Sequence, residues 1–430
     1  MKSQESKMQE DPKLKSKFQR PRGMYDILPA KQKYYGKILR TVSEVANFYR
    51  FSRIETPILE KAELFSRGIG LSTDIVKKQM FIFESNKDTL ALRPEGTASL
   101  ARAYIEGGMV SLPQPVKLWY FGPFFRHERP QAGRFRQFWQ IGFETIGKKS
   151  PILDVQIIQI SHAILEKLKF KDLLVQVNTI GCPKCRLYSK RLLKEYFKTR
   201  RNSLCADCRR RLKENVFRIL DCKEEKCQRI IKGAPQIIDH LCKECHNHFK
   251  EVLEFLDELE LPYHLNPYLV RGLDYYTKTV FELFSKAEDL ALGGGGRYDG
   301  LIKILGGEDT PGVGVAMGVE RIITGMERRP LKYKRKKVPR IFLAQIGKLA
   351  KRKSLKLLEE FRKAGIPVVE SLERDSLRAQ LDKANKMKIR HVLILGQKEL
   401  FKGEILLRDM KTGRQNMIKL ENLIKKVRKL

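Results

Sequence analysis

The sequence predicts an α+β domain built on an antiparallel sheet, interrupted by a helical cysteine-rich insertion and followed by a small α/β domain. Three observations predict this fold class. Two aromatic-rich, strand-like runs flank a charged loop, which indicates a long antiparallel hairpin. All eight cysteines lie in one basic, helical stretch. Beyond a basic linker, strands and helices alternate regularly, as in α/β domains.

The N-terminal residues 1–17 are polar and mixed in charge, so they are predicted to form a disordered leader. They lack the apolar core of a secretory signal, and no apolar run is long enough to span a membrane. We therefore expect the protein to remain in the cytoplasm.

Residues 18–329 should form the first domain, in which apolar spacing predicts the helices and β-prone runs predict the strands. A turn at Arg93–Thr97 leads into a helix, and Val313–Gly325 begins as a glycine-rich strand and becomes helical. The other predicted helices are Lys33–Phe51 and Ile152–Leu168. The predicted strands are Phe51–Pro57, Thr89–Leu92, Val116–Phe125, Phe135–Ile146 and Leu173–Asn178. The cysteine-rich insertion interrupts this strand-rich pattern, which resumes at Val270 and Val280–Phe284.

The insertion, residues 181–258, carries cysteines in four pairs: Cys182-x2-Cys185, Cys205-x2-Cys208, Cys222-x4-Cys227 and Cys242-x2-Cys245. Paired spacing in a cytoplasmic protein favours tetrahedral zinc over disulfides. Four pairs could make two four-cysteine sites. The alternative is that some or all are free thiols in a lysine-rich insertion.

Residues 330–339 read as a basic linker bounded by prolines, and residues 340–430 as the small α/β domain. Its predicted elements alternate: strand Ile341–Ile346, helix Ser354–Lys363, strand Ile366–Val369, helix Leu377–Asn385 and strand Val392–Leu395.

The formal net charge of +36 favours a polyanionic partner, with nucleic acid first. The alternative is a protein that uses lysine freely on its surface.

The segment Leu269–Glu282 is the most informative part of the chain. It places Arg271 beside Tyr275 and Tyr276 between apolar runs, and a buried guanidinium next to phenols is favourable only where a ligand completes the hydrogen bonding. The glycine run Gly293–Gly296 follows shortly after, and it allows a close approach to the backbone. Together these segments predict a small-molecule pocket.

The predicted hairpin adds arginines and aromatics to that pocket. Period-2 alternation puts Arg134, Arg136 and Phe138 on one face, with Gln140 continuing it. Arginine can clamp a phosphate bidentately, and Phe138 could stack on a nucleobase. A solvated charged hairpin is the alternative.

Two further charged groups allow two interpretations each. Glu95 could bind a ligand ammonium group, or it could favourably face a helix dipole. Arg321 could contact a terminal phosphate or form a surface ion pair. The chain has no Walker-type phosphate loop, and Gly293–Gly296 is not a dinucleotide-binding fingerprint.

These segments together resemble histidyl-tRNA synthetases, a family of class II aminoacyl-tRNA synthetases. The opening Phe18–Pro29 is similar to theirs, and Arg53–Leu59, Phe125–Glu144 and Gly312–Arg321 resemble class II motifs 1, 2 and 3. Leu269–Glu282 and Leu292–Gly300 resemble the two histidine-specific segments, which are more specific than the class motifs. The resemblance covers about residues 18–430.

The resemblance implies a role for each matching residue. Arg126 would bind the α-phosphate of ATP, Arg321 the γ-phosphate, and Arg271 would sit at the reacting carboxylate and phosphate, in place of a metal ion. Glu128 and Phe138 would receive the adenine. The implied histidine-binding residues are Glu95, Gly96, Thr97, Arg126, Gln140, Glu144, Arg271, Tyr275 and Tyr276.

It also implies the partners. ATP and Mg²⁺ would enter as the substrate complex, Gln131 would face the tRNA acceptor end, and the C-terminal domain would recognise the anticodon of a histidine tRNA. A homodimer is implied as well. Two rivals remain: the synthetase-like regulatory subunit of ATP phosphoribosyltransferase, and a basic zinc-binding RNA-binding module without catalysis. Zinc is not implied, because only part of the family carries such cysteines.

Overall fold

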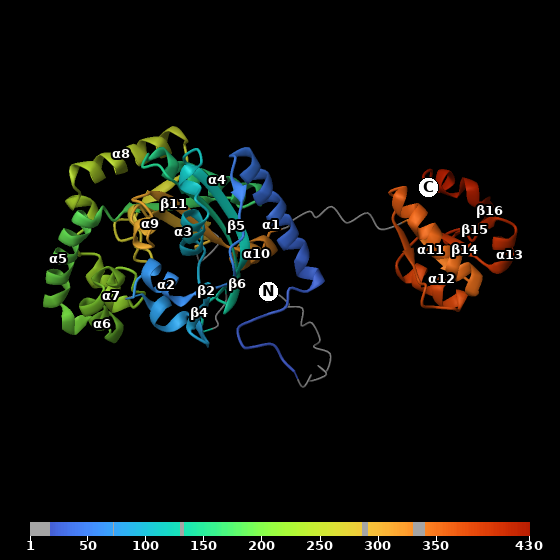
Figure 1. The fold of residues 1–430 in the computed structure, drawn as a ribbon, viewed down its shortest axis with the longest axis horizontal. Coiled ribbons are helices and arrows are strands. Elements are labelled where there is room, and N and C mark those ends of the chain that lie inside the picture. The colour runs from blue at the N-terminus through green and yellow to red at the C-terminus, as the bar shows by residue number, and fades with distance from the viewer. Residues whose placement is uncertain (1–17, 72, 130–132, 286–290, 330–339) are drawn as a thin grey trace, which may run out of the picture. The chain divides into compact units, whose positions relative to one another are not determined.

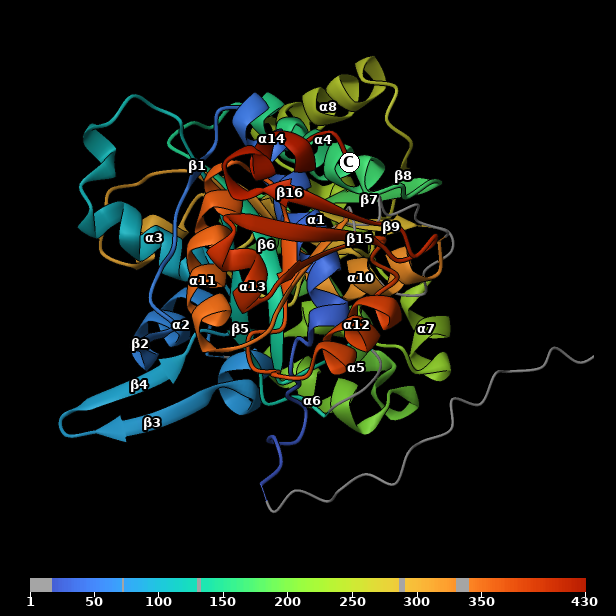
Figure 2. The ribbon, with the colours of Figure 1, turned by 90° about the vertical axis from the view of Figure 1, so that its right-hand side faces the viewer.

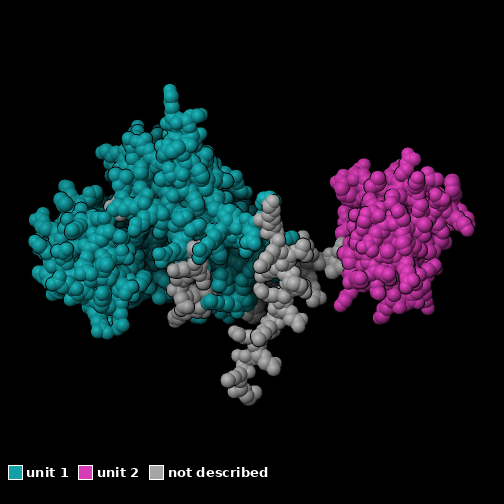
Figure 3. Space-filling model, turned by 90° about the horizontal axis from the view of Figure 1, so that it is seen from below, with its two compact units in different colours: residues 1–331 teal, residues 332–430 magenta. Residues whose placement is uncertain are grey.

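The computed structural model describes residues 18–430 except 72, 130–132, 286–290 and 330–339. The chain divides into two compact units, residues 1–331 and residues 332–430 (Figure 3). Among the described residues, no helix is both long and apolar enough to span a membrane.

The first unit is built on an eight-stranded sheet with the order β1-β5-β6-β11-β10-β9-β7-β8. The strands are β1 (Ser52–Arg53), β5 (Val116–Phe125), β6 (Gln137–Ile146), β7 (Leu173–Thr179), β8 (Tyr263–Leu265), β9 (Thr277–Ser285), β10 (Gly293–Arg297) and β11 (Gly312–Gly318). Pairing is antiparallel except at the two edges, where β1 joins β5 and β8 joins β7 in parallel. The antiparallel sheet and the β5–β6 hairpin are as predicted.

One face of this sheet is covered by helices. Alternate side chains such as Ile141, Phe143 and Val315 point to this face and join the main core. The covering helices are α1 (Pro29–Phe48), α4 (Ile152–Lys167), α8 (Lys243–Glu258) and α10 (Val319–Glu327). The sequence predicts α1 at Lys33–Phe51. Its early start follows from Pro29, which suits a first helical position because it needs no hydrogen-bonded N–H there.

The other face of the sheet lies toward α3 (Thr97–Glu106), α9 (Leu301–Ile304) and the insertion, which share a second core with it. The insertion contains α5 (Pro183–Thr199), η3 (Arg201–Ser203), α6 (Ala206–Glu214), η4 (Val216–Ile219), α7 (Glu225–Ile231) and η5 (Ile237–His240), and it ends in α8. Figure 1 shows α5, α6 and α7, in green, on the side of the unit opposite α1.

A small sheet stands beside the main one, with the order β2-β4-β3. Its strands are β2 (Leu59–Lys61), β3 (Phe81–Ser85) and β4 (Asp88–Leu92), and α2 (Ala62–Ile69) and the π-helix η1 (Ile75–Gln79) lie between β2 and β3. Figure 2 shows β3 and β4 as a projecting hairpin. The 3₁₀ turn η2 (Met109–Ser111) follows α3.

Two strand predictions fail. Of Phe51–Pro57, only Ser52 and Arg53 pair as β1. No strand begins at Val270, because residues 266–276 form an irregular segment and strand pairing resumes only at Thr277. Side chains satisfy its backbone instead: the Asn178 amide donates to the carbonyls of Pro267 (3.1 Å) and Leu269 (3.0 Å).

The second unit is an α/β fold with the sheet order β13-β12-β14-β15-β16. Its strands are β12 (Ile341–Gln345), β13 (Val368–Glu370), β14 (His391–Leu395), β15 (Glu404–Asp409) and β16 (Gln415–Lys419). Its helices are α11 (Lys348–Lys363), α12 (Leu377–Lys386), α13 (Gln397–Phe401), η6 (Leu420–Asn422) and α14 (Leu423–Val427). The alternating part is as predicted, and the antiparallel pair β15–β16 extends it.

Candidate active site

The floor of the site is the face of the sheet opposite the main core. Residues directly opposite in neighbouring strands share a face. One such row runs from Tyr120 through Gly142, Ala316 and Gly294 to Glu282. Three small residues in the middle therefore leave a shallow trough between a tyrosine and a carboxylate.

The glycines accommodate particular side chains. A Cβ on Gly142 would lie 2.0 Å from the Tyr120 ring, and one on Gly294 would lie 2.6 Å from the Arg271 guanidinium. A Cβ on Gly314 would lie 1.6 Å from the Glu144 carboxylate. The glycine run thus makes room for the chain's own arginine, in addition to any ligand.

A buried hydrogen-bonded network centres on Glu144 of β6. The Thr97 hydroxyl donates to Glu144 Oε1 (2.8 Å), and the Tyr298 hydroxyl donates to Glu144 Oε2 (2.6 Å). Burial and the nearby Glu95 raise the pKa of Glu144 to about 8, although both hydroxyl donors lower it. The raised pKa favours the protonated carboxyl, which can donate as well as accept a hydrogen bond.

Glu95 occupies the N-terminus of α3. Its two carboxylate oxygens accept from the backbone N–H groups of Thr97 and Ala98, both at 2.8 Å. The Tyr275 hydroxyl donates to the same carboxylate at 3.3 Å. Glu95 is thus a helix-start carboxylate, and it also faces the pocket through Tyr275. The two interpretations of this residue are compatible.

Two buried polar atoms near this network have no hydrogen-bond partner among the described residues. They are the Tyr120 hydroxyl and the Gln140 amide oxygen. Tyr275 packs on Tyr276 with ring centroids 4.7 Å apart. Unsatisfied buried acceptors and donors are costly, so their presence here indicates space for a polar ligand.

Three arginines converge on one end of the trough. The Arg126 Nε donates to the Pro94 carbonyl (2.9 Å), and Arg321 donates to the Ala291 carbonyl (2.7 Å). Arg271 pairs with Glu282. Burial lowers the pKa of Arg126 and of Arg321, and repulsion from neighbouring arginines adds to it in both cases. These like charges are close enough to repel each other, so an anionic ligand would stabilise the arrangement.

The motif 2 hairpin supplies an aromatic platform beside the arginines. The Arg126 guanidinium lies 5.2 Å from the centroid of the Phe138 ring. Glu128 lies 3.9 Å from Arg126 and 4.0 Å from Arg134. Gln131, predicted to face the tRNA, lies outside the described residues.

The structure brings Glu95, Thr97, Glu144 and Tyr275 into one hydrogen-bonded group and places Arg126, Arg271 and Arg321 near one another. Arg134 and Arg136 precede β6, which begins at Gln137, so the predicted alternation does not extend to them. Sequence reasoning missed Tyr120, Tyr298 and Glu282 as members of the site. Tyr298 could have been noticed because it follows the glycine run directly. Tyr120 carries no sequence signal, since its place depends on the glycines Gly96 and Gly142, which lie against its ring.

The cysteines form two groups of four. Cluster 1 contains Cys182, Cys185, Cys242 and Cys245, cluster 2 contains Cys205, Cys208, Cys222 and Cys227, and the sulfurs within each lie within 4.8 Å of one another. All eight are unpaired as disulfides. Both clusters have the donor set of a divalent metal site.

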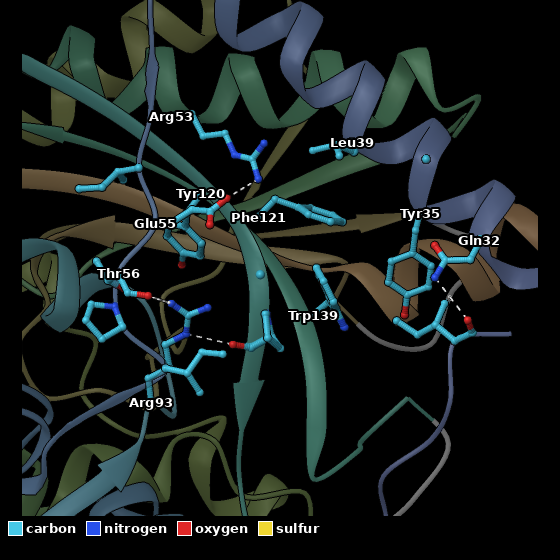
Figure 4. Close-up of a pocket in the computed structure, with 17 residues that line it drawn as sticks. Gln32, Tyr35, Leu39, Arg53, Glu55, Thr56, Arg93, Tyr120, Phe121 and Trp139 are labelled. Carbon is cyan, nitrogen blue, oxygen red and sulfur yellow. Dashed lines mark hydrogen bonds and ion pairs between the residues drawn. The ribbon is translucent and has the colours of Figure 1, made fainter. Parts of the chain in front are cut away.

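A separate cavity of about 660 Å³ lies beyond β5, between α1 and the segment after β1. Figure 4 shows Phe121 and Trp139 between Tyr35 of α1 and the Thr56–Arg93 pair. Phe121 and Trp139 point to the side of the sheet opposite the trough. This cavity therefore lies largely on the other side of the sheet from the site built on Glu144 and the arginines, and it shares Tyr120 with that site.

An antiparallel sheet with arginines converging on one face, together with a separate α/β unit, is the arrangement of class II aminoacyl-tRNA synthetases. A family model described as Histidyl-tRNA synthetase matches residues 23–322, and one described as Anticodon binding domain matches residues 341–430. The chain belongs to the histidyl-tRNA synthetase family.

Similar proteins agree with this assignment. Histidine--tRNA ligase of Desulforamulus reducens is 43% identical over 408 residues, covering 94% of this chain and 97% of the relative. That of Dehalococcoides mccartyi is 44% identical over 415 residues, covering 96% and 99%.

Solved structures are similar as well. The apo S. aureus histidyl-tRNA synthetase has a TM-score of 0.77 at 32% identity, covering 95% of this chain and 99% of that one. A structure described as an ATP phosphoribosyltransferase regulatory subunit/histidyl-tRNA synthetase, from Bacillus halodurans C, has a TM-score of 0.62 at 20% identity, with coverage of 88% and 98%, and shows only the shared fold.

Proposed function

We propose that this chain attaches histidine to its tRNA in two steps, forming histidyl-adenylate from histidine and ATP and then transferring histidine to the tRNA. The observation that carries the proposal is the convergence of Arg126, Arg271 and Arg321 beside a buried, partly unsatisfied polar pocket. A cationic end suits triphosphate, and a polar end suits an amino acid with a hydrogen-bonding ring.

Histidine would occupy the polar end. Glu144, held by Thr97 and Tyr298, can pair with an imidazole nitrogen, and Tyr275 and Tyr276 form the adjoining wall. Glu95 and the open oxygen of Gln140 can accept from the ligand ammonium group. A site built from such buried groups rejects an amino acid that leaves them unpaired.

ATP, as its magnesium complex, would occupy the cationic end. Arg126 would bind the α-phosphate and Arg321 the γ-phosphate, and Phe138 would stack on the adenine beside Glu128. Arg271 would lie at the reacting carboxylate. Attack of a carboxylate on the α-phosphate needs alignment of two anions and neutralisation of their charge, and fixed guanidinium groups supply both.

Transfer to tRNA would use other surfaces. We assign Gln131 to the acceptor end, and recognition of the anticodon to the second unit, whose family description supports that role. The net charge of +36 suits a polyanionic partner.

Histidine-dependent exchange of pyrophosphate into ATP tests this function. We expect clear exchange with histidine and none above background without it, because adenylate formation is reversible and needs the amino acid. A regulatory paralogue or a non-catalytic RNA-binding module would show no exchange. Folded protein that binds tRNA but lacks exchange would overturn the proposal.

We also propose that each cysteine cluster holds one zinc ion. The distances between sulfurs are 3.7 Å and 4.0 Å from Cys182 to Cys185 and Cys242, and 3.9 Å from Cys205 to Cys222. A tetrahedron with zinc–sulfur bonds of about 2.3 Å has edges of about 3.8 Å, whereas a disulfide needs about 2.05 Å. The free-thiol and disulfide alternatives explain neither this spacing nor the grouping in fours.

We further propose a homodimer. One face of the small sheet carries Leu59, Phe81, Phe83, Leu90 and Leu92, all half-buried or exposed, with Phe83 at 46% exposure. An apolar sheet face of this kind is typically covered by a partner, and a second copy is the partner expected for class II synthetases.

Replacing Phe83 by aspartate should shift the protein toward monomer, because a charge on this face opposes its burial. Sedimentation should give about twice the 50.0 kDa chain mass for the parental protein and a lower average mass for Phe83→Asp. Phe401→Asp, at a phenylalanine that is 79% exposed on the second unit, is the control. A parental monomer would contradict the proposal.

A further inference from the structure

The irregular segment 266–276 carries Arg271, Tyr275 and Tyr276, yet it has no strand partner. Its backbone carbonyls therefore need donors from elsewhere, because buried backbone oxygens are almost always hydrogen-bonded. Asn178 supplies donors to its first part. The part that precedes β9, and that bears the two tyrosines, is held by the insertion.

Arg186 of α5 makes that contact. A single nitrogen, Nη1, donates to the carbonyls of Asp274 and Tyr276, both at 3.0 Å. The guanidinium also lies 5.5 Å from the centroid of the Phe217 ring, on η4. The arginine is thus clamped between the insertion and the backbone on either side of Tyr275.

Cluster 1 directly adjoins Arg186. Cys182 caps α5 and Cys185 immediately precedes Arg186, while Cys242 caps α8, so the cluster ties together the starts of both helices. The backbone N–H of Cys242 donates to Cys185 Sγ at 3.1 Å. The residue next to Arg186 in the chain is therefore a member of a closed cluster.

A second contact reaches the same place from cluster 2. Asn215, between Cys208 and Cys222, donates to the Asp274 carboxylate at 2.9 Å. Arg218 pairs with Asp74 at 3.2 Å, on the segment that follows α2. The Asp274 N–H in turn donates to the Ile69 carbonyl at 3.0 Å. The insertion thus approaches Asp274 from both clusters.

We propose that Arg186 is a positioning residue for histidine: it holds the backbone of Asp274–Tyr276 so that Tyr275 and Tyr276 form the wall of the histidine pocket, and cluster 1 holds Arg186. The inference rests on the proposed function and deepens it. It gives the cysteine-rich insertion a part in amino-acid binding, apart from any contact with tRNA.

The experiment compares Arg186→Ala with Arg191→Ala by histidine-dependent pyrophosphate exchange. Arg191 is exposed on the same helix, so its removal changes charge equally without touching segment 266–276. In Arg186→Ala the KM for histidine should rise about tenfold or more, because two hydrogen bonds from a charged donor are lost and the pocket wall is displaced. The KM for ATP should stay within about twofold, because Arg126 and Arg321, which would bind its phosphates, are held by the carbonyls of Pro94 and Ala291 outside this segment.

Arg186→Lys should recover part of the loss, because a lysine ammonium can reach a carbonyl but lacks the planar guanidinium that packs on Phe217. If Arg186→Ala fails to fold, the histidine KM of Arg186→Lys is compared with that of Arg191→Ala instead. A histidine KM in Arg186→Ala equal to that of Arg191→Ala overturns the inference. So does an equal rise in both KM values with a lowered unfolding temperature, which marks a purely structural role. Absence of exchange in the parental protein and in Arg191→Ala would instead overturn the proposed function.

Discussion

Replacing Arg271 by alanine is expected to lower histidine-dependent pyrophosphate exchange by about a thousandfold or more, because the role proposed for Arg271 is to supply a fixed positive charge at the reacting centre. Arg271 lies against Gly294 on the floor of the site and pairs with Glu282. Removing it also leaves the Glu282 carboxylate uncompensated where negative phosphates must bind. Both effects oppose the transition state for adenylate formation.

Two further variants separate these effects. Glu282→Gln with Arg271→Ala removes the exposed negative charge, and should recover part of the activity without restoring the parental rate. Arg271→Lys should remain strongly impaired, since an ammonium cannot reproduce the bidentate geometry of a guanidinium. Unfolding temperatures near the parental value are the control for folding. Adenylate formation at the parental rate in Arg271→Ala would show that the assigned role is wrong.

The sequence was sufficient to predict the elements with strong patterns. The hairpin around Phe125–Glu144 could be predicted because its two strands are aromatic-rich and flank a charged loop. The strand-to-helix change at Gly312–Glu327 could be predicted from its glycines followed by a helical spacing. In both cases local preference and the tertiary fold agree.

Other features depend on tertiary context. Val270 reads as part of a strand, but segment 266–276 is satisfied by side-chain donors such as Asn178 and Arg186 that no local pattern shows. Tyr120 enters the site because sheet register places Gly142 opposite it. The register between strands that are distant in the sequence is set by the packing of the whole core. The pairing of Tyr120 with Gly142 could therefore not be predicted from the sequence.

The arrangement of the cysteines could be predicted only in part from the sequence. Their spacing predicts pairs, and the pairs allow two sites, but it does not show which pairs combine. In the structure the outer pairs form cluster 1 and the inner pairs form cluster 2. The first cluster therefore joins the two ends of the insertion, which no separation along the chain could reveal.

Purified protein prepared without chelators should contain two zinc ions per chain, and Cys245→Ser and Cys208→Ser should each contain one. The two sulfur atoms belong to fully buried residues of different clusters. Structural zinc contributes about 10–16 kcal/mol in zinc-finger peptides, comparable to or above the stability of a whole domain at about 5–15 kcal/mol. Loss of either ion should therefore unfold the insertion locally, which limited proteolysis within residues 181–258 would detect.

Both variants should contain less zinc than their controls, and Cys245→Ser should also resemble Arg186→Ala in its kinetics. Cys245→Ser should raise the KM for histidine, because cluster 1 holds the start of α5 and thus Arg186. Lys184→Ser and Ala206→Ser, at exposed positions within one cysteine pair of cluster 1 and one of cluster 2, should keep both zinc ions and the parental KM. Parental protein without zinc contradicts the metal assignment. Zinc loss in Cys245→Ser with an unchanged histidine KM would separate the metal from amino-acid binding, and would leave the insertion a purely structural support.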